Sequence, residues 1–275
     1  MYGICSVQPT DADWDLKENN LTLLVVPEWK ACLTKTTGEK LEIFGDPAYR
    51  DQIRPGIDAA WERGPAPTRW DMSVVAEPKL AKNKGLAGTT IRELAKARNV
   101  HPLDALLDLA LEEELNTGFA FKGSRNMDPE AIAAIMKSPQ CVLGISDAGA
   151  HFNMLSGAEY STFVLSHWVR ERGVLSLEQA IYKLTFMNAS LMGLADRGLL
   201  HPGYAADVLV LDPDTVRPLA KEKAFDLPNG EERIVVHGQG IKHTIVNGEP
   251  LMEDNTHSGA FPGKVLKSTD YGRTG

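Results

Sequence analysis

The chain lacks the features of a secreted or membrane-spanning protein. Its 275 residues include only three cysteines, Cys5, Cys32 and Cys141, which lie far apart and form no C-x-x-C pair. Such sparse cysteines are typical of reduced thiols in a cytoplasmic protein. Residues 1–10 contain no basic, apolar leader, and no run approaches the roughly 18 apolar residues that span a bilayer. We therefore expect a cytoplasmic protein with no membrane partner.

The sequence also lacks an excess of positive charge. It has 29 Lys and Arg against 37 Asp and Glu, which gives a formal net charge of −8 at pH 7. Phosphate binding needs a basic surface, so we expect no nucleic-acid partner. The 43% hydrophobic and 24% charged residues are ordinary for a globular protein, and the length supports one large domain or two unequal ones.

Histidine is scarce, and its spacing excludes the common zinc motifs. None of the seven histidines precedes residue 101, and none belongs to an H-x-H or H-E-x-x-H pair. A zinc site needs three or four convergent ligands, so the sequence displays no complete zinc site. It also has no G-x-S-x-G nucleophile elbow and no phosphate-binding glycine loop. The histidines are His101, His151, His167, His201, His237, His243 and His257.

Local signals predict an α/β region followed by a mostly β region, with the boundary near residue 195. Capping boxes at Thr90 and Ser176 predict helix starts, as do Asp-Pro pairs at 46–47 and 128–129 and the proline at 102. We expect Pro55 to kink or divide the helix over residues 47–63, and Ile135 to face the core. Predicted strands cover residues 21–26, 72–76 and 141–145, and then 207–211, 233–237, 242–246 and 250–252.

The most informative segment is residues 141–151, Cys-Val-Leu-Gly-Ile-Ser-Asp-Ala-Gly-Ala-His. A short apolar run there ends in a carboxylate, a glycine and a histidine. In a parallel α/β protein, a buried strand delivers polar groups to the catalytic rim in this way. A carboxylate at that position can ligate a divalent metal and take a proton from a metal-bound water, which makes Asp147 the principal candidate.

Simpler interpretations stay open for these candidate residues and for His167. Asp147 could cap the turn that follows it, and His151 could be a hydrogen-bonding surface group. His167 lies on a predicted helix, where packing is favoured over ligation. Ser146 could act as a nucleophile, although no partner base is evident in the sequence.

These residues resemble those of a known family. Residues 146–151 (Ser-Asp-Ala-Gly-Ala-His) and 167–173 (His-Trp-Val-Arg-Glu-Arg-Gly) look like the later barrel segments of N-acyl-D-amino-acid deacylases, which belong to the metal-dependent amidohydrolase superfamily. Residues 197–212 are similar to the point where that superfamily's chain returns to a small β-sandwich. Residues 245–248 and 259–266 look like the deacylase ending. The resemblance covers nearly the whole chain and is strong from about residue 85.

The resemblance implies an α/β fold: the C-terminal part of a (β/α)8 barrel over residues 1–195, and strands of a composite β-sandwich over residues 196–275. It implies zinc-dependent hydrolysis of the amide bond of a small N-acyl amino acid. Asp147 matches the family's last-strand aspartate, which activates the water, hands on its proton and can touch the metal. His151 is the candidate substrate-binding residue.

The family's remaining metal ligands come from earlier strands, and nothing in this sequence matches them. The chain therefore reads as roughly the C-terminal half of such an enzyme, and we expect it to be inactive without the missing N-terminal half. In a second interpretation the chain is not itself an enzyme. It is a non-catalytic remnant or a partner subunit that completes its barrel with a second polypeptide. In a third interpretation it is a metal-free enzyme that uses Ser146.

Overall fold

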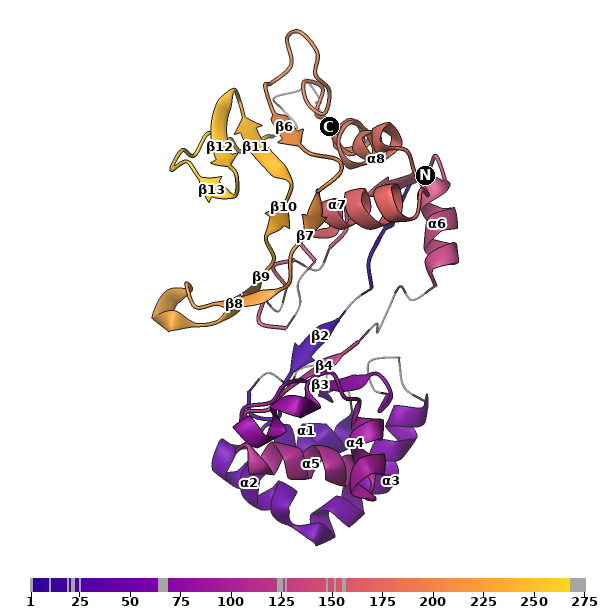
Figure 1. The fold of residues 1–275 in the computed structure, drawn as a ribbon, viewed down its shortest axis with the longest axis vertical. Helices are drawn as coiled ribbons and strands as arrows, with labels where there is room; N and C mark the ends of the chain where they lie inside the picture. The colour runs from indigo at the N-terminus through magenta and orange to yellow at the C-terminus, as the bar shows by residue number, and fades with distance from the viewer. Residues whose placement is uncertain are drawn as a thin grey trace. The chain divides into compact units, whose positions relative to one another are not determined.

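The computed structural model describes residues 2–9, 11–18, 20, 23–24, 26–63, 69–122, 126, 128–146, 148–150, 152–154 and 157–267. Its contacts divide the chain into two compact units. Unit 1 comprises Met1–Gln8, Asp128–Ala148 and Ser156–Gly275, and unit 2 comprises Pro9–Met127 and Gly149–Leu155. Helices and strands occur in both, so the α/β class is confirmed (Figure 1). The division into a barrel part (1–195) and a sandwich part (196–275) stays a prediction.

Unit 2 is a three-stranded antiparallel sheet packed with helices. The strands are β2 (Ala12–Trp14), β4 (Gly118–Phe121) and β3 (Ser73–Glu77), in the order β2-β4-β3. The helices are α1 (Pro27–Leu33), α2 (Thr37–Gly45), α3 (Pro47–Arg63), the short 3-10 turn η3 (Ala81–Leu86), α4 (Ile91–Arg98) and α5 (Pro102–Glu112).

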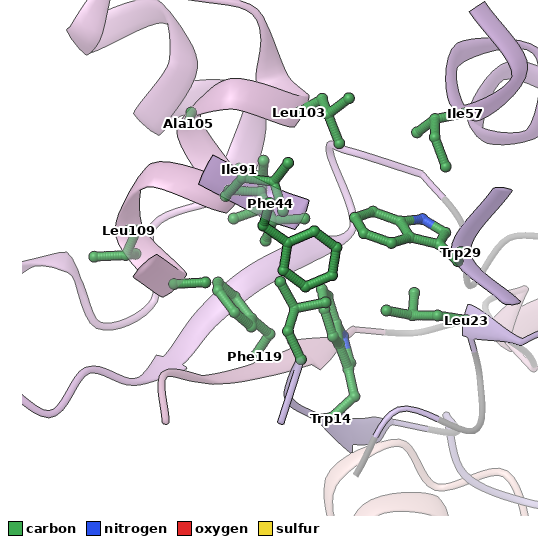
Figure 2. Packing of buried hydrophobic residues seen from close by; sticks show 14 of the residues in the cluster. Trp14, Leu23, Trp29, Phe44, Ile57, Ile91, Leu103, Ala105, Leu109 and Phe119 are labelled. Atoms are coloured by element: carbon green, nitrogen blue, oxygen red, sulfur yellow. The ribbon is translucent and has the colours of Figure 1, made fainter. Parts of the chain in front are cut away.

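The aromatic side chains of these strands organise the core of unit 2. Trp14 lies opposite Phe119 in the ladder and stacks on it, with the ring centroids 4.7 Å apart, and it also stacks on Phe121 at 5.1 Å. Figure 2 shows the buried side chains from the strands and from helices α1 to α5 converging on this cluster, where Phe44 meets Trp29 edge-on. One continuous apolar core therefore joins the sheet to its helices.

Local signals placed the starts of α3, α4 and α5 correctly and predicted neither α1 nor α2. The capping box at Thr90 is present: Glu93 N–H donates to Thr90 Oγ1 at 3.1 Å, and Thr90 N–H donates to the Glu93 carboxylate at 2.9 Å. Helix α3 runs through Pro55, so it is not divided there, and the alternative of a kink stays a prediction. At Gly56 a Cβ atom would collide with the side chain of Glu28, so glycine provides the room for that side chain.

The predicted strand over residues 21–26 is also wrong for its described residues. Leu23 and Leu24 lie in a turn, and Val26 is the residue before α1. Leu23 is fully buried and Val26 nearly so. Their apolar character serves burial in the core of unit 2, and burial alone does not distinguish a strand from a turn.

Unit 1 begins with a parallel pair of strands, β1 (Gly3–Cys5) and β5 (Cys141–Leu143). Around this pair its helices bury a second apolar cluster that includes Val7, Leu143 and Trp168. The helices are α6 (Pro129–Lys137), α7 (Tyr160–Phe163), the π-helical segment η4 (Val164–Glu171), α8 (Leu177–Leu184) and α9 (Phe186–Met192).

Helix α6 begins where predicted, because the Asp128 carboxylate accepts hydrogen bonds from the N–H groups of Glu130 and Ala131, both at 3.0 Å. Its inward face was predicted less well. Ile132 and Met136 are buried, but Ile135 is 49% exposed, and Ala133 takes the buried position instead.

The chain after α9 is mostly β, as the sequence predicts. A four-stranded antiparallel sheet has the order β13-β12-β11-β6, and the pairs β10-β7 and β8-β9 accompany it. The strands are β6 (Val208–Leu211), β7 (Arg217–Pro218), β8 (Glu222–Ala224), β9 (Arg233–Val235), β10 (Gly238–Gln239), β11 (Ile241–Val246), β12 (Glu249–Glu253) and β13 (Thr256–His257), with the turn η5 (Pro228–Gly230) before β9. In the part of the chain described, no helix has the length and apolar character to cross a membrane.

Candidate functional site

The candidate site lies where the parallel strands of unit 1 end. Strand β5 is buried along its length, and the residues directly after it, Gly144 and Ile145, are exposed. A buried strand that opens into an exposed segment is the setting predicted for a catalytic carboxylate. Asp147 and His151 themselves lie outside the described residues, so their catalytic, metal-binding and substrate-binding roles stay predictions.

An amide side chain from α9 holds the end of β5 in place. Asn188 Nδ2 donates a hydrogen bond to the carbonyl oxygen of Leu143 at 2.8 Å. A Cβ atom on Gly144 would lie 3.3 Å from the same nitrogen, so glycine leaves space for this contact. The last carbonyl of β5 is thereby satisfied, and the segment that leads to Asp147 starts from a fixed point. The sequence carries no local signal for Asn188, because the contact spans 45 residues.

The end of β1 carries its own polar groups. Trp168 Nε1 donates to the Val7 carbonyl at 2.6 Å, and Gln8 Nε2 donates to Glu159 Oε1 at 3.1 Å. The other oxygen of Glu159 accepts from Gly157 N–H at 2.8 Å. Gln8 follows the carboxyl end of β1, which is parallel to β5, and its hydrogen bond brings Glu159, the residue before α7, to that end. Sequence reasoning missed this pair, which is 151 residues apart in the chain.

The other candidates from the sequence have structural partners. His167 Nδ1 lies 3.0 Å from Glu171 Oε2, and its ring stacks on Phe163 with centroids 4.9 Å apart, which supports the packing role. Ser146 Oγ accepts a hydrogen bond from Ala148 N–H at 3.3 Å. Among the described residues no histidine bonds Ser146, so nothing there supports it as an activated nucleophile.

The thiols of Cys5 on β1 and Cys141 on β5 and the ammonium of Lys183 on α8 lie close together in unit 1. Cys5 and Cys141 are buried free cysteines. Burial, and after it the neighbouring Cys141, raises the pKa of the Cys5 thiol to about 11. Burial also lowers the pKa of Lys183, whose Nζ donates to the carbonyl oxygens of Ser138 and Cys141, both at 2.7 Å. A thiol with a raised pKa stays protonated at neutral pH and is a poor nucleophile, which assigns Cys5 to the core, and burial assigns Cys141 there as well.

Residues 197–212, singled out in the sequence, serve a structural purpose. The Arg197 guanidinium pairs with Asp207 and donates to Asn247 Oδ1 at 3.1 Å, and Asp207 Oδ1 accepts from Asn247 N–H at 2.8 Å. Gly198 has φ +86°, and a Cβ there would come within 2.7 Å of Phe186 Cα. These contacts connect the segment after α9 to the first residue of that helix and to the β11–β12 turn, which is a structural role.

The described residues do not fit a metal ion. No group of three or more His, Cys, Asp and Glu side chains in the described ranges could hold one. Zinc needs three or four such ligands, and adding Asp147 would supply a single carboxylate.

Comparison with known proteins shows to which family the chain belongs. Residues 42–252 match the amidohydrolase family. The chain belongs to this family. It is 35% identical over 145 residues to the D-aminoacylase of Alcaligenes xylosoxydans xylosoxydans, which covers 52% of this chain and 28% of that protein. The predicted resemblance to the N-acyl-D-amino-acid deacylase branch is therefore confirmed.

Two further relatives extend the comparison. An uncharacterized protein of Mycobacterium tuberculosis is 28% identical over 254 residues, covering 86% of this chain and 40% of that protein. The structure of N-acyl-D-glutamate deacylase from Bordetella bronchiseptica, complexed with zinc and a phosphonate inhibitor, is 25% identical with a TM-score of 0.42 and covers 74% of this chain and 43% of that one. This amidohydrolase chain thus spans less than half the length of each of these relatives.

Proposed function

We propose that this chain is the C-terminal part of an enzyme that hydrolyses the amide bond of N-acyl-D-amino acids or related amides. The observation that carries the proposal is the buried strand β5, which is parallel to β1 and opens into the exposed segment directly before Asp147. The named relatives support the substrate class, since one is a D-aminoacylase and another an N-acyl-D-aspartate deacylase, 38% identical over 114 residues.

In this proposal Asp147 is the general base. Its carboxylate takes a proton from the water that attacks the amide carbonyl and returns it to the departing amine, as positioned carboxylates do in hydrolases. The Asn188–Leu143 hydrogen bond positions the segment that carries Asp147. His151, four residues further on, contacts the substrate.

Zinc is the cofactor that the family resemblance implies, and the described residues do not provide its site. We infer that most ligands come from outside this chain. The purified chain alone is then expected to bind no stoichiometric zinc and to hydrolyse no amide.

The second candidate is a subunit that completes a barrel with another polypeptide. In the described part of unit 1, the β1–β5 sheet has two strands, and Ile4 on β1 is 63% exposed. An open parallel edge with an exposed apolar side chain needs a cover, which either a longer chain or a partner could provide.

The test pairs this chain with the part of the Alcaligenes D-aminoacylase that precedes the matched 145 residues. Zinc content and hydrolysis of N-acetyl-D-amino acids are measured for the chain alone, for the co-expressed pair, and for the pair carrying Asp147→Asn. We expect activity only in the wild-type pair, with a loss of at least about 100-fold in Asp147→Asn. An active Asp147→Asn pair would disprove the base assignment, and zinc-dependent hydrolysis by the chain alone would disprove the inferred incompleteness.

A further inference from the structure

Unit 1 contains a pocket of about 490 Å³ beside the amino end of β5. Val174, Leu175 and Met187 form its apolar wall, and the last two are 5% and 6% exposed. The volume lies within the range of small-molecule sites, which are mostly apolar with a few polar groups that fix the ligand's orientation.

The described lining includes two lysines and no acidic residue. Lys183 is 7% exposed, and its Nζ gives two hydrogen bonds to the Ser138 and Cys141 carbonyls. An ammonium has three N–H donors, so one remains. The charged residues of this described lining are both cations, and such a pocket in a protein with a net charge of −8 favours an anion.

The remaining polar groups of the lining are also donors. Lys137 is the exposed last residue of α6, and within the described ranges it has no ion pair. Gln179 uses its Oε1 to accept from Ser176 N–H at 3.0 Å, which leaves the Nε2 donors for a ligand. Tyr182 is half exposed and adds a hydroxyl. The pocket thus has several donors facing an apolar wall.

We propose that this pocket binds a small monocarboxylate with an apolar tail, the carboxylate at Lys137 and Lys183 and the tail against Val174, Leu175 and Met187. The site is separate from the candidate active site. Lys183 bonds the carbonyls of residues 138 and 141, at the amino end of β5, whereas Asp147 follows its carboxyl end. A phosphate or sulfate would leave the apolar wall without a partner, so the tail is part of the assignment.

Calorimetric titration of the purified chain with octanoate, octanamide and octylamine tests the ligand class. The three probes share one tail and differ in head-group charge. We expect octanoate to bind about tenfold more tightly than octanamide, and octylamine to bind more weakly than either. Shortening the tail to butyrate and then acetate should weaken binding, by at most about fourfold per methylene. Equal affinities for the three head groups, or no octanoate binding, would overturn the proposal.

Three variants locate the bound octanoate. Lys137→Glu reverses one charge at the pocket and should weaken binding by about five- to tenfold. Lys264→Glu makes the same change at another exposed lysine of unit 1 and should leave the affinity unchanged. Asp147→Asn should also bind octanoate normally. The inference fails if Lys137→Glu and Lys264→Glu behave alike, or if Asp147→Asn changes the affinity, since octanoate would then bind at the carboxyl end of β5. None of these readouts depends on hydrolysis.

Discussion

Unit 2 encloses its core, whereas unit 1 leaves apolar surface open. In unit 2 the apolar faces of α4, α5 and the three-stranded sheet are buried in one cluster. In unit 1, Ile4 on β1 is 63% exposed, and Leu209 and Val210 on β6 are 48% and 41% exposed. Both faces of β6 are thus apolar and partly open to solvent.

This contrast suggests different roles for the two units: we expect unit 2 to be the more stable one, whereas unit 1 carries the candidate site. We expect the closed apolar core of unit 2 to support its cooperative folding. In the described residues, the candidate site of unit 1 lies on a sheet of two strands, which helices cover but which has no further strand along its edges. The proposed incompleteness therefore predicts that unit 1 is the weaker of the two.

We expect the largest contrast in the free energy of unfolding when one leucine is replaced by alanine in each unit. Leu106→Ala removes a fully buried side chain of α5 and should lower the free energy of unfolding by about 3 kcal/mol. Leu209→Ala, at a half-exposed position of β6, should change it by less than about 0.5 kcal/mol. Urea unfolding followed by tryptophan fluorescence measures both. A cost at Leu209 equal to that at Leu106 would mean that β6 is covered in solution, for example by a second copy of the chain.

Unit 2 offers a second contrast between two neighbouring carboxylates, of which Glu113 is buried and Glu114 is exposed. Glu113 accepts hydrogen bonds from the N–H groups of Lys79 and Leu80 at 2.8 and 2.9 Å, from Asn83 Nδ2 at 2.9 Å and from Thr117 Oγ1 at 2.7 Å. Burial raises the pKa of Glu113, but these hydrogen bonds outweigh burial and hold the pKa below its usual value. Glu113→Gln should cost about 3 kcal/mol at pH 7, because the amide cannot accept all four bonds.

The pH dependence of this cost has a definite sign. Since the folded pKa is lowered, the stabilisation by Glu113 is present above the unfolded pKa of about 4 and is lost as the pH falls through the folded pKa. The difference in stability between wild type and Glu113→Gln should therefore shrink below about pH 4. The neighbouring exposed Glu114→Gln is the matched control and should show neither effect. A pH-independent difference would contradict the assignment.

The sequence predicted what local chemistry determines and missed what distant contacts determine. The capping boxes at Thr90 and Ser176 mark real helix starts, because donor and acceptor lie three residues apart. The run at residues 21–26 misled because burial is a tertiary property. Asn188 was invisible for the same reason. Its partner Leu143 belongs to another element, and no short-range pattern marks an amide that will satisfy a distant carbonyl.

The smallest expected effects come from the capping boxes at the starts of α4 in unit 2 and α8 in unit 1. Glu93 N–H donates to Thr90 Oγ1 at 3.1 Å in α4, and Gln179 N–H donates to Ser176 Oγ at 3.2 Å in α8. Thr90→Ala and Ser176→Ala should each cost about 1 kcal/mol. Hydrogen exchange should distinguish them. In cooperative unit 2, Thr90→Ala should lower protection throughout the sheet and helices, whereas in the open unit 1, Ser176→Ala should lower it mainly within α8. A loss of protection spread over all of unit 1 in Ser176→Ala would mean that this unit also folds as one cooperative body, and the contrast between the units would then be one of surface alone.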